Sequence, residues 1–363
     1  MSADVPIVQV RTSAYVIPTD APESDGTAAW NSTTLVIAEI EAGGRTGLGY
    51  TYADRSAAEF IRRVLAPELQ NREAFAIERH WSAMNAAVRN IGRPGIAACA
   101  ISALDIALWD LKARLLGISL ANLLGPARDS VPVYGSGGFT SYDNARLRGQ
   151  LAGWVEEGCA FVKMKIGREP ARDVARVGVA KAAIGDAALF VDANGGYTRK
   201  QALAFAEQFA DYDVRWFEEP VSSDDLGGLR LLRDRAPGTM DIAAGEYGYT
   251  PYYFHTMLAA GAVDVLQADA TRCGGITGFL RAAALCDGFQ IPLSSHCAPA
   301  AHLAAAAAAP RLAHMEWFHD HVRIEHMLFD GAPTLRNGRI SPDWSAPGHG
   351  LVFRRSDATP YEA

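Results

Sequence analysis

Three acidic residues each close a short apolar run in the second half of this 363-residue chain: Asp192, Glu218 and Glu246. If these runs are neighbouring parallel strands, the three carboxylates converge at one sheet edge and repel one another. A hard cation relieves that repulsion, and an all-oxygen set without Cys or His favours Mg²⁺. The alternative is that each acid caps the following helix. An acidic residue at the end of each of three consecutive runs favours the metal site over three separate helix caps.

Two lysines lie two positions apart at the end of the preceding apolar run. A strand alternates its side chains, so Lys163 and Lys165 point the same way and Met164 points the other way. Two ammonium groups inside one barrel are costly unless they are used, and each is expected to lower the pKa of the other. Lys165 is therefore a candidate base.

A histidine and further acids follow at the ends of later runs. Asp269 and His296 close neighbouring runs, so we expect the carboxylate to hold the imidazole and to raise its basicity. Glu316 is the inward candidate on the last run, and it can donate a hydrogen bond if burial keeps it protonated. The His296–Asp269 pair would then face Lys165 across the mouth of a barrel.

This set of residues suits the removal of a proton next to a carboxylate. Such a proton is too weakly acidic for lysine or histidine alone, and a divalent cation on the carboxylate oxygens stabilises the enediolate that forms. If a second base returns the proton, the product is an epimer. If its conjugate acid protonates a β-hydroxyl, water leaves and a keto acid results.

The elements that must position these residues recur regularly. Eight apolar runs, 22 to 30 residues apart, leave room for one helix in each gap and predict a closed parallel barrel. No clean amphipathic helix is evident after the eighth run, which predicts a (β/α)7β barrel of the TIM type. The runs begin near Val131, Phe161, Leu189, Val214, Met240, Val263, Gln290 and Leu312.

A different pattern precedes the barrel. Val8–Val16, Thr33–Glu41 and Gly47–Tyr52 predict strands, and apolar residues between Gly95 and Gly117 recur at helical spacing. We therefore predict an α+β capping domain over residues 1–128, the barrel over 129–331, and a C-terminal tail over 332–363 that returns to the capping domain.

The composition of the chain limits the classes of molecule that it is expected to bind. A net charge of −7 without a Lys/Arg run makes nucleic acid improbable, and the longest run of small apolar residues, Leu303–Ala309, is too short to span a membrane. Five scattered cysteines indicate reduced residues, and Met1–Asp20 lacks a signal-peptide pattern. The prediction is a cytoplasmic protein whose partner is a small carboxylate.

As an ordered set, these motifs resemble the enolase superfamily and, within it, the mandelate racemase subgroup. The resemblance covers nearly the whole chain. Its segments are Lys163-Met164-Lys165, Val191-Asp192-Ala193-Asn194, Glu218-Glu219-Pro220, Gly245-Glu246, Asp269, Gly274-Gly275-Ile276-Thr277-Gly278, His296 and Pro347-Gly348.

The resemblance implies roles for these residues. Mg²⁺ would be bound by the three carboxylates, Lys165 and His296 would be the two bases, and Lys163 and Glu316 would contact the substrate carboxylate. It also implies a symmetric homo-oligomer, often an octamer. Capping loops would select the substrate, here Pro18–Trp30 and Tyr50–Arg55.

Polar residues in the first loop favour a polyhydroxylated acid, and therefore an acid-sugar dehydratase that forms a 2-keto-3-deoxy acid. A mobile loop without substrate contact is the alternative. Further candidates for substrate contact are Glu23, Tyr52, Arg93, Asn194 and Arg272. A racemase or epimerase, a sugar-acid cycloisomerase and a barrel that binds without chemistry remain open. His319-Asp320-His321 is interpreted as a local turn in preference to a second metal site.

Overall fold

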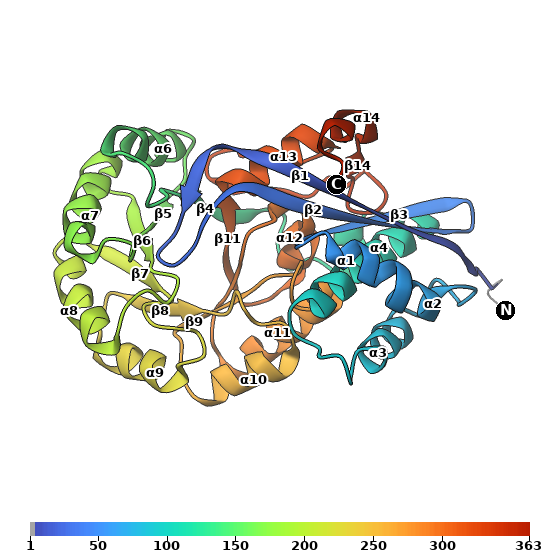
Figure 1. Ribbon diagram of the computed structural model, residues 1–363, viewed down its shortest axis with the longest axis horizontal. Coiled ribbons are helices and arrows are strands. Elements are labelled where there is room, and N and C mark those ends of the chain that lie inside the picture. The colour runs from blue at the N-terminus through green and yellow to red at the C-terminus, as the bar shows by residue number, and fades with distance from the viewer. Residues whose placement is uncertain (1–3) are drawn as a thin grey trace.

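An eight-stranded parallel barrel forms the larger part of the computed structural model, which describes residues 4–363 (Figure 1). The last strand also pairs with the first, so the sheet closes. The first three residues of the predicted capping domain lie outside the described residues. The barrel strands are β4 (Val131–Gly137), β5 (Phe161–Lys165), β6 (Ala188–Asp192), β7 (Val214–Glu218), β8 (Asp241–Ala244), β9 (Val265–Ala268), β10 (Leu293–Ser295) and β11 (Leu312–Phe318).

Each strand begins within three residues of its predicted start, which confirms the parallel barrel. Short, buried, apolar strands are what a sheet covered by helices requires. The helices that follow the strands in order are α6 (Asn144–Glu156), α7 (Pro170–Ile184), α8 (Arg199–Ala210), α9 (Leu226–Arg235), α10 (Pro251–Ala259), α11 (Gly275–Phe289), α12 (Pro299–Ala308) and α13 (His319–Leu328).

The helix α13 corrects the expectation that no regular helix follows the eighth strand. It begins directly after β11, and its buried face carries Asp320, His321 and Glu325 beside Ile324 and Leu328. Polar residues on the buried face hide the amphipathic pattern, so the sequence resembled a turn. Glu325, for example, accepts hydrogen bonds from the Tyr50 hydroxyl at 2.5 Å and the Ala300 amide at 3.1 Å.

The N-terminal unit is a three-stranded antiparallel sheet packed on helices. The α4 helix fills the predicted interval and ends at Gly117, which adopts a left-handed conformation with φ 68°. The elements are β1 (Ile7–Ser24), β2 (Ala29–Ala42), β3 (Arg45–Tyr52), α1 (Ser56–Phe60), the π-helix η1 (Ile61–Leu65), α2 (Ala66–Leu69), α3 (Ile77–Ala87), α4 (Ile96–Leu116) and α5 (Leu120–Leu124).

The C-terminal tail contacts both parts of the molecule. His349 Nε2 lies 2.7 Å from the Leu48 carbonyl oxygen, the Ala363 amide donates to the Ala14 carbonyl at 3.0 Å, and β13 pairs with β4. The division of the chain after residues 128 and 331 stays a prediction. The tail elements are β12 (Phe329–Asp330), β13 (Arg339–Ile340), β14 (Val352–Phe353), α14 (Arg355–Ala358) and the 3₁₀ helix η2 (Thr359–Tyr361).

The segment Pro18–Trp30, expected to be a loop, is largely a β-hairpin that reaches over the barrel (Figure 1). The strand β1 continues to Ser24 despite a register irregularity between Pro18 and Glu23. Two prolines and the polar residues around them conceal this extension, because they interrupt the apolar alternation that marks a strand. Ser24 accepts a hydrogen bond from the Thr140 amide at 2.8 Å, which ties the tip to the barrel mouth.

At the hairpin tip, Gly26 allows a backbone approach that no other residue permits. A Cβ atom at this position would lie 2.1 Å from the Ala193 carbonyl oxygen and 2.8 Å from that of Ile166. Both obstacles are backbone atoms that follow barrel strands, so they cannot move aside as a side chain would. The hairpin tip must therefore move away from the barrel when Gly26 is replaced by a larger residue.

We predict that Gly26→Ala loosens the hairpin from the barrel. A steric cost of about 1–3 kcal/mol corresponds to roughly tenfold or faster exchange of the Thr140 amide hydrogen. Hydrogen exchange of the peptide that contains Thr140, followed by mass spectrometry, measures this rate. Gly238→Ala is the matched control because nothing lies within 4 Å of its added Cβ. Equal exchange in the two variants would contradict the prediction.

Candidate active site

Three carboxylates gather at the carboxyl ends of β6, β7 and β8. Asp192 and Glu218 are the last residues of adjacent strands and are paired in register, and Glu246 follows β8 by two residues. One oxygen from each lies within 4.8 Å of the others, and all three side chains are buried. The predicted convergence is thus present in the fold.

The arrangement fits a hard divalent cation. Oxygen atoms alone form the set, and Oε2 of Glu246 is buried and accepts no well-formed hydrogen bond, although His296 Nε2 lies 3.3 Å away. Burial also raises the pKa of Glu218 to about 8, and the neighbouring Asp192 carboxylate adds to this effect. A cation would favour ionised carboxylates here, so the donors present suit Mg²⁺.

The two lysines bind these carboxylates directly. Lys163 is fully buried, and its Nζ lies 2.6 and 2.7 Å from the oxygens of Glu218 and 2.9 Å from Glu316 Oε1. Lys165 Nζ lies 2.5 Å from Asp192 Oδ2. The lysines were expected to lower each other's pKa. Burial does favour that direction, but the carboxylates outweigh it, and the pKa of both lysines is raised.

Glu316 also departs from expectation. It was expected to donate a hydrogen bond if burial kept it protonated, yet the nearby Lys163 ammonium outweighs burial and lowers the pKa of Glu316 well below its usual range. The carboxylate acts as an acceptor from Ser136 Oγ at 2.6 Å and from the Cys297 amide at 2.7 Å. The difference arises because Lys163 and Glu316 are far apart in the sequence, which does not show that their side chains lie side by side.

His296 and Asp269 form the predicted pair. His296 Nδ1 lies 2.8 Å from Asp269 Oδ2, and the other oxygen of Asp269 accepts from the amide and the hydroxyl of Thr271, each at 2.7 Å. Asp269 is therefore held in place, and its bond to Nδ1 leaves Nε2 of His296 for other partners. Burial alone would raise the pKa of Asp269, but the hydrogen bond to His296 lowers it below its usual range.

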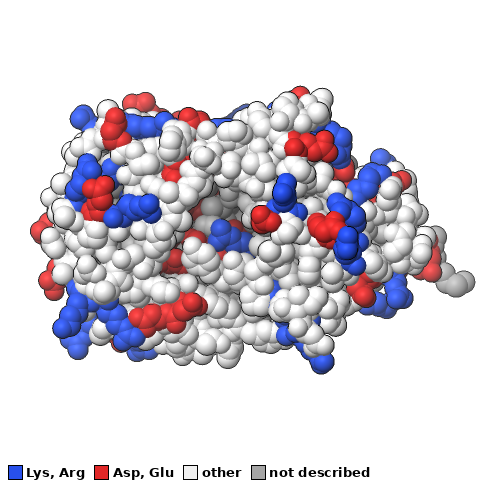
Figure 2. Space-filling model, in the orientation of Figure 1, with Lys and Arg blue, Asp and Glu red and all other residues white. Residues whose placement is uncertain are grey.

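A cavity of about 370 Å³ opens above these groups. Figure 2 shows the corresponding face, with a central hollow that contains positively and negatively charged side chains. Six of the predicted site residues line the cavity: Tyr52, Lys165, Asn194, Glu246, Arg272 and His296. Five others lie buried beside them at or near the strand ends: Lys163, Asp192, Glu218, Asp269 and Glu316.

Glu23 does not line this cavity. It is 1% exposed, its Oε2 accepts from Trp30 Nε1 at 2.8 Å, and burial raises its pKa to about 8. Of the polar hairpin residues that favoured a polyhydroxylated acid, Asp25 lines the cavity. The polar lining comes also from Ser32, Thr33 and Thr34, which lie further along β2.

Several lining residues were not found from the sequence. His321, assigned to a local turn, stacks on Tyr52 with ring centroids 3.5 Å apart and accepts a hydrogen bond from the Ala298 amide at 3.2 Å. Cys297 lies next to His296, and burial raises the pKa of its thiol to about 12. Its place directly after the predicted histidine was the available signal.

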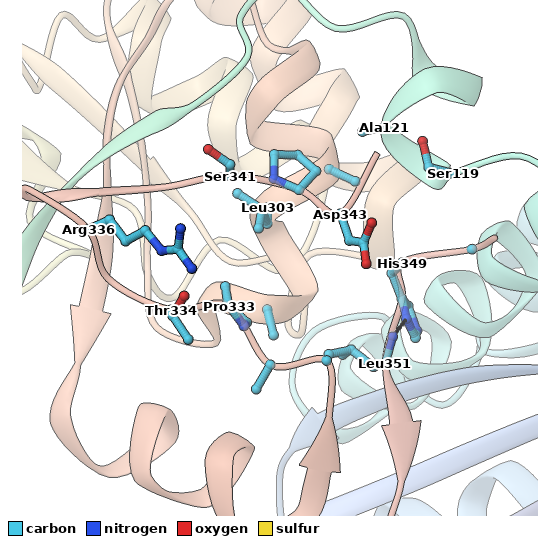
Figure 3. Close-up of a pocket in the computed structure, with 16 residues that line it drawn as sticks. Ser119, Ala121, Leu303, Pro333, Thr334, Arg336, Ser341, Asp343, His349 and Leu351 are labelled. Atoms are coloured by element: carbon cyan, nitrogen blue, oxygen red, sulfur yellow. Dashed lines mark hydrogen bonds between the residues drawn. The ribbon is translucent and has the colours of Figure 1, made fainter. Parts of the chain in front are cut away.

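A second cavity, of about 350 Å³, lies outside the barrel between α5, α12 and the C-terminal tail (Figure 3). Its polar residues bind their own chain: Asp343 accepts hydrogen bonds from the Ser345 and Ala346 amides, and Ser119 caps α5. It holds no counterpart of the lysine, carboxylate and imidazole cluster. The barrel mouth is therefore the better candidate for chemistry.

Comparison with known protein families places both parts of the chain. Residues 7–125 match the sequence profile of the mandelate racemase / muconate lactonizing enzyme N-terminal domain, and residues 146–358 match an enolase C-terminal domain-like profile. A mandelate racemase/muconate lactonizing enzyme-like protein from Rubrobacter xylanophilus is 53% identical, with a TM-score of 0.97 over 99% of this chain and 100% of that chain.

Relatives of named activity catalyse different reactions. A 3,6-anhydro-alpha-L-galactonate cycloisomerase from Streptomyces coelicolor is 35% identical over 96% of this chain and 97% of its own length. An L-talarate/galactarate dehydratase from Salmonella typhimurium is 33% identical, over 96% and 88% respectively. A racemase structure from Streptomyces coelicolor with bound magnesium is 33% identical, with a TM-score of 0.93 over 98% and 100%.

We predict that Glu246→Gln weakens Mg²⁺ binding by at least about tenfold, because it removes one of three charged ligands. Isothermal titration calorimetry measures the affinity. Glu325→Gln is the control, since Glu325 is equally buried, lies outside the three-carboxylate set, and has a pKa raised by burial to about 8. Equal Mg²⁺ affinity in wild type and Glu246→Gln would contradict the metal site.

Proposed function

Because the chain belongs to the mandelate racemase/muconate lactonizing enzyme family of the enolase superfamily, we propose that it removes the α-proton of a polyhydroxylated carboxylic acid and then eliminates the β-oxygen. With a free β-hydroxyl, this reaction releases water and forms a 2-keto-3-deoxy sugar acid. The enzyme would then be a Mg²⁺-dependent hydro-lyase, an acid-sugar dehydratase.

The observation that carries the proposal is the position of two potential bases in one cavity. Lys165 and His296 both line it, and Glu246, one of the three clustered carboxylates, lies between the barrel strands that carry them. Each base has its own carboxylate partner, Asp192 for the lysine and Asp269 for the histidine. One group can take the proton while the other delivers a proton to the leaving oxygen.

The surrounding residues define what each base does. Nδ1 of His296 donates to Asp269, so Nε2 is the nitrogen that takes up or gives up a proton in the cavity. Burial lowers the pKa of His296, but the neighbouring Cys297 and Glu246 outweigh it, and the pKa is raised above its usual range. Lys163 is fully buried among carboxylates, so its role is to hold the floor of the site in place. Mg²⁺ bound by the three carboxylates would stabilise the negative charge that develops on the substrate carboxylate and would weaken their hold on the lysines.

The lining supports a polyhydroxylated substrate with a single carboxylate. Ser32, Thr33 and Thr34 line the cavity, and hydroxyl side chains suit hydrogen bonds to sugar hydroxyls, although that of Thr33 donates to Asp320. The described lining has two Lys or Arg side chains: Lys165, bound to Asp192, and Arg272, 3.6 Å from both Glu246 and Asp269. Neither of these two is free to receive a second carboxylate, so we propose an aldonic acid or its anhydro form over an aldaric acid.

Two related outcomes use the same residues. If the β-oxygen belongs to a ring, the elimination opens the ring without loss of water, which is favoured by the similarity to the cycloisomerase. If the second base returns the proton to carbon, the reaction is an epimerisation. Both begin with the same proton removal, and the product distinguishes them.

We predict that incubation with Mg²⁺ and a library of aldonic, anhydro-aldonic and aldaric acids yields an α-keto acid from a monocarboxylic member. Mass spectrometry distinguishes the reactions: dehydration gives a product lighter by one water, and ring opening gives a product of equal mass. When the reaction is run in D₂O, deuterium incorporation at C2 without a keto acid would indicate epimerisation. Absence of all three changes with every acid would contradict catalysis.

Lys165→Ala and His296→Asn test the two bases. General acid–base groups contribute about 10²–10⁴-fold, so each variant should lose at least about a hundredfold in kcat on the accepted acid. Lys200→Ala and His255→Asn are matched controls on exposed helix positions. Full turnover by both base variants would contradict the assignment.

We also propose a cytoplasmic homo-oligomer, such as an octamer. Exposed apolar side chains that include Ile91 at 62% and Tyr252 at 73% support association, and five cysteines without a disulfide among residues 4–363 support a reducing compartment. No helix within residues 4–363 has the length and apolarity to cross a membrane. Light scattering that gives a monomer mass, or cell fractionation that recovers the chain from the medium, would contradict these proposals.

A further inference from the structure

A thiol lies directly beside the imidazole nitrogen that faces the cavity. Cys297 Sγ is 3.3 Å from His296 Nε2, and both side chains line the cavity while being 4% exposed. Proton removal has no evident use for this thiol. Glu316 completes a group of three, with one ligand atom of each residue within 4.8 Å of the others.

The backbone holds this group in position. Cys297 and Ala298 both adopt left-handed conformations, with φ 51° and 37°, so the chain turns sharply just after His296. The Cys297 amide donates to Glu316 Oε2 at 2.7 Å, which ties the turn to β11. Asp269 occupies the other imidazole nitrogen and thereby orients Nε2, as a carboxylate does behind many metal-bound histidines.

The sulfur–nitrogen distance is close to the edge of a tetrahedral zinc site. Metal bonds of about 2.3 Å to sulfur and 2.0 Å to nitrogen place the two ligand atoms about 3.5 Å apart. The observed Sγ–Nε2 separation is 3.3 Å, whereas Glu316 Oε2, 3.9 Å from Nε2, would move about half an ångström closer to complete the site. Oε1 of Glu316 faces Lys163 at 2.9 Å, so Oε2 is the oxygen that would serve as the ligand.

We propose that His296, Cys297 and Glu316 form an inhibitory site for a thiophilic divalent cation such as Zn²⁺ or Cd²⁺. Sulfur and imidazole nitrogen select these ions, whereas the nearby all-oxygen set selects Mg²⁺. Binding releases the thiol proton and the proton on His296 Nε2, where present, to solvent, and no redox change is needed. Three protein ligands leave a fourth position for water.

Inhibition follows because the ion takes the lone pair of His296 Nε2, which the reaction requires for a proton. This consequence rests on the proposed function, whereas binding of the ion does not. The site also accounts for a thiol in a cavity otherwise suited to polar acids. Mg²⁺ and the thiophilic ion would occupy separate places, so excess Mg²⁺ would not relieve the inhibition.

The first experiment measures binding without any assay of activity. Cd²⁺ is titrated into the Mg²⁺-loaded protein, and the ultraviolet charge-transfer absorption of a Cd²⁺–thiolate bond is followed. We expect a saturable signal in wild type and in Cys159→Ser, whose buried cysteine lies outside the site, and its loss in Cys297→Ala. His296→Asn, checked for folding by circular dichroism, should weaken Cd²⁺ binding by at least about tenfold.

The second experiment measures inhibition by Zn²⁺ at saturating Mg²⁺, relative to each variant's own uninhibited rate. We expect the half-inhibiting Zn²⁺ concentration to rise at least about tenfold in Cys297→Ala and to stay unchanged in Cys159→Ser. Equal inhibition of Cys297→Ala would place the ion at the three carboxylates and overturn the proposal. A missing Cd²⁺ signal in wild type would overturn it too, whereas a chain that binds Cd²⁺ but turns over no acid would contradict only the proposed function.

Discussion

The burial of several charged side chains at the barrel mouth is the constraint on which this structure depends. Asp192, Glu218, Glu246 and Glu316 face the two buried lysines Lys163 and Lys165, so four carboxylates meet two ammonium groups. Burial makes each unpaired charge costly, and a divalent cation bound to the carboxylates would offset their excess over the ammonium groups. The same electrostatics that organise the floor therefore explain why the site suits Mg²⁺ and an anionic substrate.

Parallel strand alternation made much of this site predictable from sequence. Lys165, Asp192 and Glu218 end paired strands in register, and Lys163 lies two residues before the end of its strand on the same side, so spacing along the chain translates directly into proximity. Charge states were less predictable, because the ionisation of Glu316 depends on Lys163, which lies on a strand far away in the sequence. Local sequence also concealed α13, whose buried face is polar, and the extension of β1 through two prolines.

Two parts of the chain line the cavity. Barrel strands supply the bases and carboxylates, whereas β2 and the end of β3 supply the hydroxyls and rings of the upper cavity. Buried polar bonds hold these parts together: Thr33 donates to Asp320, and Thr51 Oγ1 donates to the Thr271 carbonyl at 2.6 Å. Because Thr271 also orients Asp269, the N-terminal sheet is linked to the His296 imidazole through only a few bonds.

The central claim is that one of Lys165 and His296 removes the C2 proton beside a metal-bound carboxylate, while the other delivers a proton to the leaving oxygen. A crystal structure of the His296→Asn variant with Mg²⁺ and the accepted acid tests it most directly. We predict the ion on Asp192, Glu218 and Glu246, the acid's carboxylate on the ion, and its C2 atom about 3–3.5 Å from Lys165 Nζ or from the side chain at position 296. An acid bound with C2 turned away from both positions, or an ion held elsewhere, would contradict the account.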